Sequence, residues 1–137
     1  MKQSLKQGNK NIIGGYGEEI AANYLKRKGF QVIQQNYLKK WGEIDIVARE
    51  TNKIRFIEVK TVSYGTKADL KAAISRGTYR PEENVHYKKL SRLNRAIESW
   101  IMENNYIGEW EIDVIAIRCV PHEKYATVKY LPNIILD

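Results

Sequence analysis

Cysteine, histidine and proline are all scarce in this chain of 137 residues, which contains one, two and three of them respectively. The single cysteine, Cys119, excludes a disulfide within the chain and a zinc site built from several cysteines. His86 and His122 have no partners at metal-ligand spacing, so we interpret both as surface residues. No apolar run approaches the roughly 20 residues of a membrane-spanning helix, and the first ten residues are too polar for a signal peptide. We therefore expect a cytoplasmic protein with no membrane partner.

Acidic residues are outnumbered by basic ones, 16 against 23, which gives a formal net charge of +7. The excess is uneven, since residues 1–40 carry eight bases and two acids, whereas residues 41–60 carry four of each. A basic field raises the local concentration of polyanions and speeds their encounter with the protein. Many soluble proteins are equally basic for solubility alone, so charge leaves nucleic-acid binding and plain solubility as equal alternatives.

The length and the 43% of hydrophobic residues predict one globular domain over residues 1–137. Residues 1–10 form a polar N-terminal arm whose composition allows mobility, and residues 36–42 and 62–80 are expected to be loops, the second with one short helical turn at most. Hydrophobic periodicity, Gly29 as a helix stop and Pro81 as a helix start predict the other elements. These are helices over 14–28 and 81–104 and strands over 30–35, 41–50, 53–61, 110–119 and 124–131. The order α-β-β-β-α-β-β indicates an α/β fold.

Two carboxylates are predicted to meet on a β-hairpin. Segments 41–50 and 53–61 are joined by a tight turn at Thr51-Asn52, and pairing across it brings Asp45 roughly opposite Glu58. Two carboxylates so close repel each other unless a proton or a cation lies between them. Because side chains alternate along a strand, the apolar residues of the first strand should share the face opposite Asp45: Ile44, Ile46 and Ala48.

The same hairpin places Lys60 two residues beyond Glu58, on the same face. Carboxylate oxygens suit Mg²⁺ or Mn²⁺, which take one or two carboxylates together with water and substrate phosphate. Lys60 is then placed to orient an attacking water or to stabilise charge on a phosphate. The structural alternative is an ordinary solvated sheet face, on which Asp, Glu and Lys are common.

A third carboxylate, Glu18, lies on the face of the first helix that is expected to dock on the sheet. It shares a stripe with Ala21, Ala22 and Leu25. A buried carboxylate without a partner is costly, and Gly14 and Gly17 permit a close approach of the helix backbone. Glu18 could therefore converge with the hairpin residues, whereas the alternative is an acidic residue favoured by the helix dipole.

Several basic residues are candidates for contacts with a phosphate backbone. Trp41 follows Lys39 and Lys40, and it could stack on a base or cover the edge of the core. For the candidates on the second helix, the alternative is a solvated helix face, and for those in the long loop it is a mobile surface. Among the helix candidates, Lys89 lies nearest the side that packs on the core. The candidates are Lys39, Lys40, Arg76, Arg80, Lys88, Lys89 and Arg92.

At these residues the sequence resembles the YraN family, whose members are small bacterial proteins related to archaeal Holliday-junction resolvases in the PD-(D/E)xK nuclease superfamily. The resemblance rests on G-x-x-G-E-x-x-A over residues 14–21, G-E-I-D-I-V-A over 42–48 and F-I-E-V-K-T over 56–61. Further matches are Val85, Lys89, Leu93, Ala96, the strand around Asp113, and Pro132-Asn133. Two departures are Val62, where the family usually has an arginine, and a longer segment before Pro81.

The resemblance implies a restriction-endonuclease-like core, in which helices flank a mixed β-sheet, and hydrolysis of phosphodiester bonds with Mg²⁺ or Mn²⁺. It assigns Asp45 and Glu58 as metal-binding acids, Lys60 as the catalytic lysine, and Glu18 as the helix acid that completes the metal site. The implied substrate is DNA rather than RNA, branched or single-stranded, and pairing into a homodimer would fit relatives that cut two strands symmetrically. The alternative is a non-catalytic nucleic-acid-binding or interaction protein that retains the nuclease fold.

Overall fold

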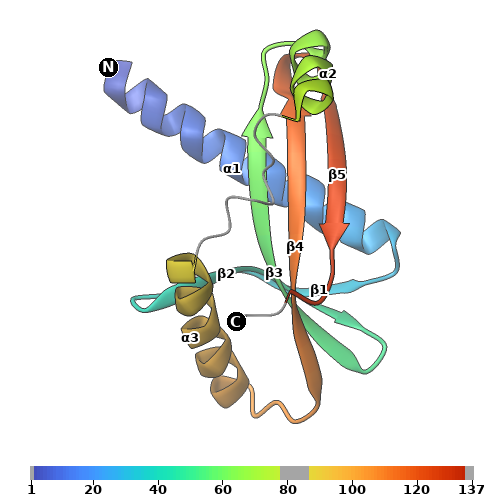
Figure 1. The fold of residues 1–137 in the computed structure, drawn as a ribbon. Coiled ribbons are helices and arrows are strands. Elements are labelled where there is room, and N and C mark those ends of the chain that lie inside the picture. Colours follow the sequence, from blue (N-terminus) through green and yellow to red (C-terminus); the bar gives the residue numbers. More distant parts are fainter. Residues whose placement is uncertain (1, 78–86, 135–137) are drawn as a thin grey trace.

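The computed structural model describes residues 2–77 and 87–134, which form a five-stranded sheet with helices on both faces (Figure 1). The elements in chain order are α1 (Lys2–Arg27), β1 (Gln31–Lys39), β2 (Gly42–Glu50), β3 (Lys53–Ser63), α2 (Lys67–Arg76), α3 (Tyr87–Glu103), β4 (Glu109–Val120), the short 3₁₀ helix η2 (Pro121–Glu123) and β5 (Tyr125–Leu131). The predicted α/β class and order are confirmed, with α2 as an additional helix. No helix in the described part of the chain is long and apolar enough to cross a membrane.

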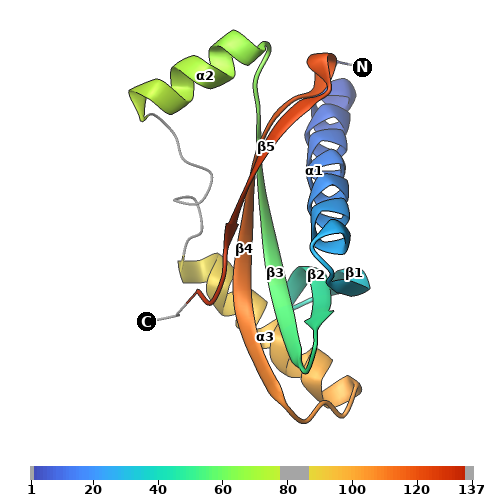
Figure 2. The same ribbon diagram turned by 90° about the vertical axis from the view of Figure 1, so that its right-hand side faces the viewer.

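The sheet is mixed, with the strands arranged in the order β1-β2-β3-β4-β5. Only β3 and β4 run parallel, and the other three neighbouring pairs are antiparallel. Parallel neighbours need a crossover connection, and the segment that contains α2 and α3 provides it. In Figure 2, α1 lies on one side of the sheet, and α2 and α3 lie on the other. β3 and β4 are therefore covered on both faces, which explains why β4 is apolar on both.

Two hydrophobic cores fill the two faces of the sheet. Under α1, the buried residues include Ala21, Leu25, Ile57, Ile115 and Ile117. Under α3, they include Ile44, Phe56, Leu93, Ile97 and Trp100. The docking stripe predicted for the first helix is confirmed, because Ala21, Ala22 and Leu25 are all buried against the sheet.

The first helix begins at Lys2, well before the predicted start at Gly14. The polar N-terminal segment has no proline, and its lysine, glutamine and asparagine residues can all extend a helix. The helix ends as predicted, since Gly29 adopts the left-handed conformation at φ 93° and its N–H donates to the carbonyl oxygen of Lys26.

Two segments expected as loops are largely regular structure. The strand predicted over 30–35 continues to Lys39, so only Lys40 and Trp41 form the turn between β1 and β2. β3 extends to Ser63, and α2 is ten residues long rather than one turn, with Thr66 capping its start and Gly77 its end. The helix start predicted at Pro81 lies outside the described residues, and the described helix α3 ends at Glu103, next to the predicted Asn104.

The hairpin of β2 and β3 forms through the Thr51-Asn52 turn, as predicted, with Thr51 at φ 55°. Its pairing runs from Glu50↔Lys53 to Ile46↔Ile57 and stops there. The predicted common face of Ile44, Ile46 and Ala48 is wrong, because Ile44 packs under α3 whereas the other two pack under α1. Before Ile46, the residues of β2 pair only with β1, so this part of the strand has separated from β3. The alternation of side chains along β2 is therefore interrupted at Asp45.

Candidate active site

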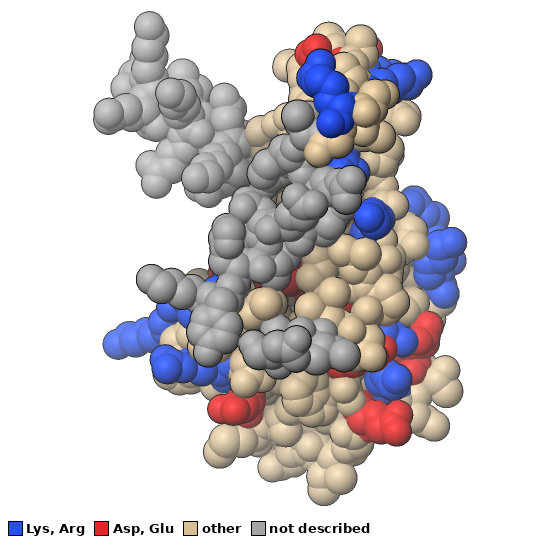
Figure 3. Space-filling model, in the orientation of Figure 1, with Lys and Arg blue, Asp and Glu red and all other residues tan. Residues whose placement is uncertain are grey.

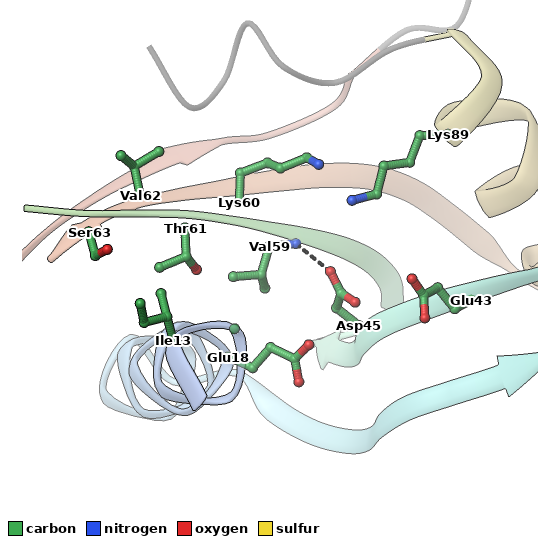
Figure 4. A pocket seen from close by; sticks show the side chains of 11 residues that line it. Ile13, Glu18, Glu43, Asp45, Val59, Lys60, Thr61, Val62, Ser63 and Lys89 are labelled. Carbon is green, nitrogen blue, oxygen red and sulfur yellow. Dashed lines mark hydrogen bonds between the residues drawn. The ribbon is translucent and has the colours of Figure 1, made fainter. Parts of the chain in front are cut away.

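Asp45 lies at the fork where β2 separates from β3. The backbone N–H of Val59 donates a 2.8 Å hydrogen bond to Oδ2 of Asp45, in place of the strand pairing that has ended one residue earlier (Figure 4). This bond holds the carboxylate against β3. Asp45 therefore faces a cavity, although it lies within β2.

Glu58 is the most deeply buried acid of the candidate site, with 2% of its surface exposed. Its Oε1 atom lies 2.5 Å from Nζ of Lys89 on α3 and 3.9 Å from Nζ of Lys60. The Lys89 ammonium therefore balances the buried charge of Glu58 in the protein without metal.

Glu18 reaches the same place from α1, and its side chain points toward Asp45 (Figure 4). The close approach of α1 depends on Gly17, where a Cβ atom would lie 1.9 Å from Oγ1 of Thr61 on β3. The side chain of Asn36 forms a hydrogen bond with the Glu18 carboxylate. Asn36 itself is left-handed at φ 56°, a conformation that asparagine tolerates better than most residues.

Burial and neighbouring charges shift the pKa values of the side chains in the site. Burial, and then the negative charge of Glu58, raise the pKa of Asp45 to about 8. Burial raises the pKa of Glu18, with a contribution from Glu43 and Glu58. Burial and the neighbouring Lys89 lower the pKa of Lys60 to about 8. Asp45 therefore holds a proton at neutral pH, first because it is buried and then because Glu58 lies nearby, which is an expected state of a cation site without its cation.

Three carboxylates and two lysines of the site border a cavity of about 650 Å³. Figure 4 shows Lys60 and Lys89 on one side of the Asp45 carboxylate and Glu18 on the other, with Glu43 at the end nearest β2. The lining residues are Ile13, Gly14, Glu18, Glu43, Asp45, Val59, Lys60, Thr61, Val62, Ser63 and Lys89. A second cavity of about 320 Å³ adjoins Glu43, Glu58, Lys89, Arg92 and Leu93, so Lys89 borders both.

The four residues predicted as catalytic are thus close together, but the structure also brings in residues that sequence reasoning missed. Asn36 falls in the segment predicted as a loop, and Glu43 is not among the predicted site residues. Gly42 belongs to the same site, because a Cβ there would lie 1.9 Å from the carbonyl oxygen of Arg92 and would separate α3 from β2. The signal that could have identified Gly42 is its place at the start of the GEID segment, where a close approach explains glycine.

The predicted phosphate-contact residues are more scattered. Lys39 forms a 3.0 Å ion pair with Glu103, and Trp41 donates a 2.6 Å hydrogen bond to Ser99, so both contact α3. Lys40 is exposed in the turn, and Arg92 is exposed beside the second cavity. Arg76 is exposed near the end of α2, where basic side chains gather (Figure 3). Arg80 and the side chain of Lys88 lie outside the described residues.

Within residues 2–77 and 87–134, no three His, Cys, Asp or Glu side chains form a group that could hold a metal ion by themselves. This finding does not conflict with the chemistry of Mg²⁺, which keeps several waters and commonly takes only one or two carboxylates. Asp45, whose pKa is raised by burial and by the nearby Glu58, and the buried carboxylate of Glu58 fit such an ion.

The fold and the site together define a small α/β protein with an acidic, lysine-bordered cavity where a β-hairpin forks. The chain belongs to the family described as uncharacterised protein family UPF0102, which matches residues 17–117. A UPF0102 protein of Alkaliphilus oremlandii is 37% identical over 125 residues, covering 88% of this chain and 95% of that protein. A UPF0102 protein of Desulfitobacterium hafniense strain Y51 is 39% identical over 118 residues, covering 84% of this chain and 88% of the relative. A third, from Nocardia farcinica, is 31% identical and covers 83% of this chain and 82% of its own length.

Proposed function

We propose that this protein is a metal-dependent endonuclease that hydrolyses phosphodiester bonds in nucleic acid, in DNA rather than RNA, with branched or single-stranded DNA as the first candidates. One observation carries the proposal. Glu18 from α1, Asp45 from β2 and Lys60 from β3 border one cavity, and Glu58 lies close enough to Asp45 for its negative charge to raise the pKa of the Asp45 carboxyl. A purely structural cluster would be more stable with fewer like charges.

The resemblance to the YraN family and the PD-(D/E)xK nucleases supports the same proposal. All four positions that the resemblance assigns to the metal site and the catalytic lysine are occupied by the expected residues. The mixed sheet with helices on both faces agrees with the restriction-endonuclease-like core that the resemblance implies. Asp45 and Glu58 would hold Mg²⁺ or Mn²⁺, and Glu18 would complete the ligand set.

In this proposal, Asp45, Glu58 and Glu18 would hold a metal ion, which would supply Lewis-acid activation of the phosphate and of water. The chain supplies the positioning. The Val59 N–H fixes the direction of the Asp45 carboxylate, and Asn36 fixes that of Glu18. Lys60, whose pKa is lowered to about 8, can hold or release a proton near neutral pH and can orient the attacking water.

Substrate contacts outside the metal site would come from basic side chains that face solvent. Lys89 and Arg92 border the cavities, and Lys40 and Arg76 are exposed farther away. Such contacts neutralise phosphates without reading sequence, so binding should weaken as salt concentration rises. A homodimer would allow two strands to be cut, and light scattering of the purified protein with and without DNA would test for it.

The direct experiment measures cleavage of labelled linear, branched and single-stranded DNA and RNA with Mg²⁺, Mn²⁺ or EDTA. We expect cleavage that is lost in EDTA and falls at least about a hundredfold in Asp45→Ala and in Lys60→Met. Asp69→Asn is the matched control, because Asp69 is an exposed carboxylate on α2 and does not border the cavity. Cleavage that survives Asp45→Ala would contradict the assignment of the site.

A non-catalytic nucleic-acid-binding protein is the second candidate, and one observation favours it. The ion pair between Lys89 and Glu58 already balances the buried acid without a metal. For this candidate we expect binding of nucleic acid that is independent of metal, with no cleavage of any substrate in the set. Metal-dependent cleavage of even one substrate would rule it out.

A further inference from the structure

Lys89 places a second lysine in the candidate site, from the opposite face of the sheet to α1. Its Nζ is 2.5 Å from Oε1 of Glu58, whereas Nζ of Lys60 is 3.9 Å from the same oxygen. Since Glu58 is almost fully buried, its charge needs a nearby cation. In the protein without metal, Lys89 is the nearer of these two cations.

A metal ion held by Glu58 would lie next to the Lys89 ammonium, because both would bind the same carboxylate. Two cations at one carboxylate repel each other, and a divalent ion attracts the carboxylate more strongly than an ammonium does. We infer that Lys89 and the divalent ion exclude each other at Glu58, so that metal binding releases the Lys89 ammonium to contact a phosphate of the nucleic acid. This inference rests on the proposed function, because it takes Glu58 as a metal ligand.

The structure favours Lys89 over Lys60 as the lysine that moves. The Lys60 side chain is 16% exposed and extends from β3, which pairs with Ala116 of β4 at this residue. The Lys89 side chain is 40% exposed and borders both cavities, so it has open space into which it can move away from Glu58. The four-carbon side chain of lysine carries its charge flexibly, which suits a change of partner.

Release of Lys89 has two measurable consequences. The metal must displace an existing ion pair, so it binds this protein more weakly than it would bind the same carboxylates without Lys89. The released ammonium borders the larger cavity, so phosphate groups bind more tightly when the metal is present. Lys89 would thereby act as a positioning residue that couples the loading of metal to the binding of substrate.

The first experiment measures the affinity for Mn²⁺ by calorimetry, without nucleic acid. Lys89→Met keeps the length of the side chain and removes the charge, and we expect it to bind Mn²⁺ at least about tenfold more tightly than the wild type. Lys89→Arg keeps the charge and should stay near the wild-type affinity. Lys71→Met is the matched control, an exposed lysine on α2, and should leave the affinity unchanged. General damage to the fold weakens metal binding, so a gain cannot come from it.

The same variants separate the two proposals. If the wild type binds no Mn²⁺, the metal-dependent function itself is refuted. If the wild type binds Mn²⁺ and Lys89→Met binds it equally or more weakly, only the exclusion of metal by Lys89 is refuted. A binding measurement with DNA uses Ca²⁺ in place of the reactive metal. Adding Ca²⁺ should increase the affinity of the wild type for DNA more than it increases the affinity of Lys89→Met. An equal increase in both proteins would also overturn the inference.

A second measurement needs only the wild-type protein, in case Lys89→Met does not fold. Acetic anhydride labels free amines, and mass spectrometry reports the extent of labelling at each lysine. We expect Mn²⁺ to increase the labelling of Lys89 at least about twofold, because the amine leaves its ion pair, while the exposed Lys71 serves as the internal reference. Unchanged or decreased labelling of Lys89 at saturating Mn²⁺ would contradict its release.

Discussion

Thr61 on β3 occupies the space that a side chain at Gly17 on α1 would need, since a Cβ atom built there would lie 1.9 Å from Oγ1 and 2.9 Å from Cβ of Thr61. The contact lies one residue from Glu18, so it sets how closely the helix acid approaches the hairpin. At Gly15, two residues earlier, a Cβ atom would have nothing within 4 Å. The two glycines therefore allow a comparison of alanine at a crowded and at an open position of the same helix.

We predict opposite effects for alanine at these two positions. Gly17→Ala should lower the free energy of unfolding by about 1–3 kcal/mol, because the helix must move away from β3. Gly15→Ala should raise it by up to about 1 kcal/mol, because alanine stabilises an open helix position. Urea denaturation measures both, and Thr61→Ala should partly restore the Gly17→Ala variant. A neutral Gly17→Ala would contradict the close approach.

Asp45 should destabilise the metal-free protein. Burial and Glu58 raise the pKa of its carboxyl in the folded state, so the folded protein holds a proton that the unfolded chain releases. Its contribution to stability is therefore full at low pH and is lost as the pH rises toward about 8, the raised value.

The test compares the wild type with Asp45→Asn in EDTA at pH 5 and pH 8. Asparagine can still accept from Val59 and carries no charge, so the variant should be more stable than the wild type at pH 8, by about 1 kcal/mol or more. The difference should shrink at pH 5 and reverse when saturating Mn²⁺ stabilises only the wild type. An asparagine variant that is less stable at pH 8 in EDTA would show that repulsion at the site is not significant.

Asp113 should stabilise the fold outside the candidate site. It is fully buried, and its carboxylate accepts from Tyr130, from the backbone N–H of Asn133 at 2.8 Å, and from Arg55 at 3.1 Å. It thereby joins β3, β4, β5 and the segment after β5. Asp113→Ala removes one member of a buried ion pair and should cost about 3 kcal/mol or more in urea denaturation. Glu109→Gln, at an exposed position of the same strand, should change stability by less than about 0.5 kcal/mol.

Cys119 should react slowly in the native protein. The side chain is fully buried in β4, and burial raises the pKa of its thiol, so little of the reactive thiolate forms at neutral pH. An aromatic disulfide reagent should label it at least about tenfold more slowly in buffer than in urea. Ser75→Cys, at an exposed position of α2, supplies a thiol that should react at once in both conditions. Equally fast reaction of Cys119 in buffer would contradict its burial.

Part of the candidate site could be predicted from residues close together in the chain. The Thr51-Asn52 turn and the apolar segments on either side of it were enough to place Asp45 near Glu58, because a two-residue turn sets the register of a hairpin. The stripe through Ala21 and Leu25 was enough to turn Glu18 toward the sheet, because the helical repeat is short and regular.

The sequence by itself therefore determined the acids, the lysine that follows them and the class of fold. Only the tertiary structure decided that β2 separates from β3 at Asp45, that Asn36 forms a hydrogen bond with Glu18, and that Lys89 on α3 contacts Glu58 on β3. The physical reason is the distance along the chain over which each interaction acts. Turn and helix geometry act over a few residues, whereas the partner of a buried charge depends on which helix packs on which face of the sheet, and that is settled only when the whole sheet has formed.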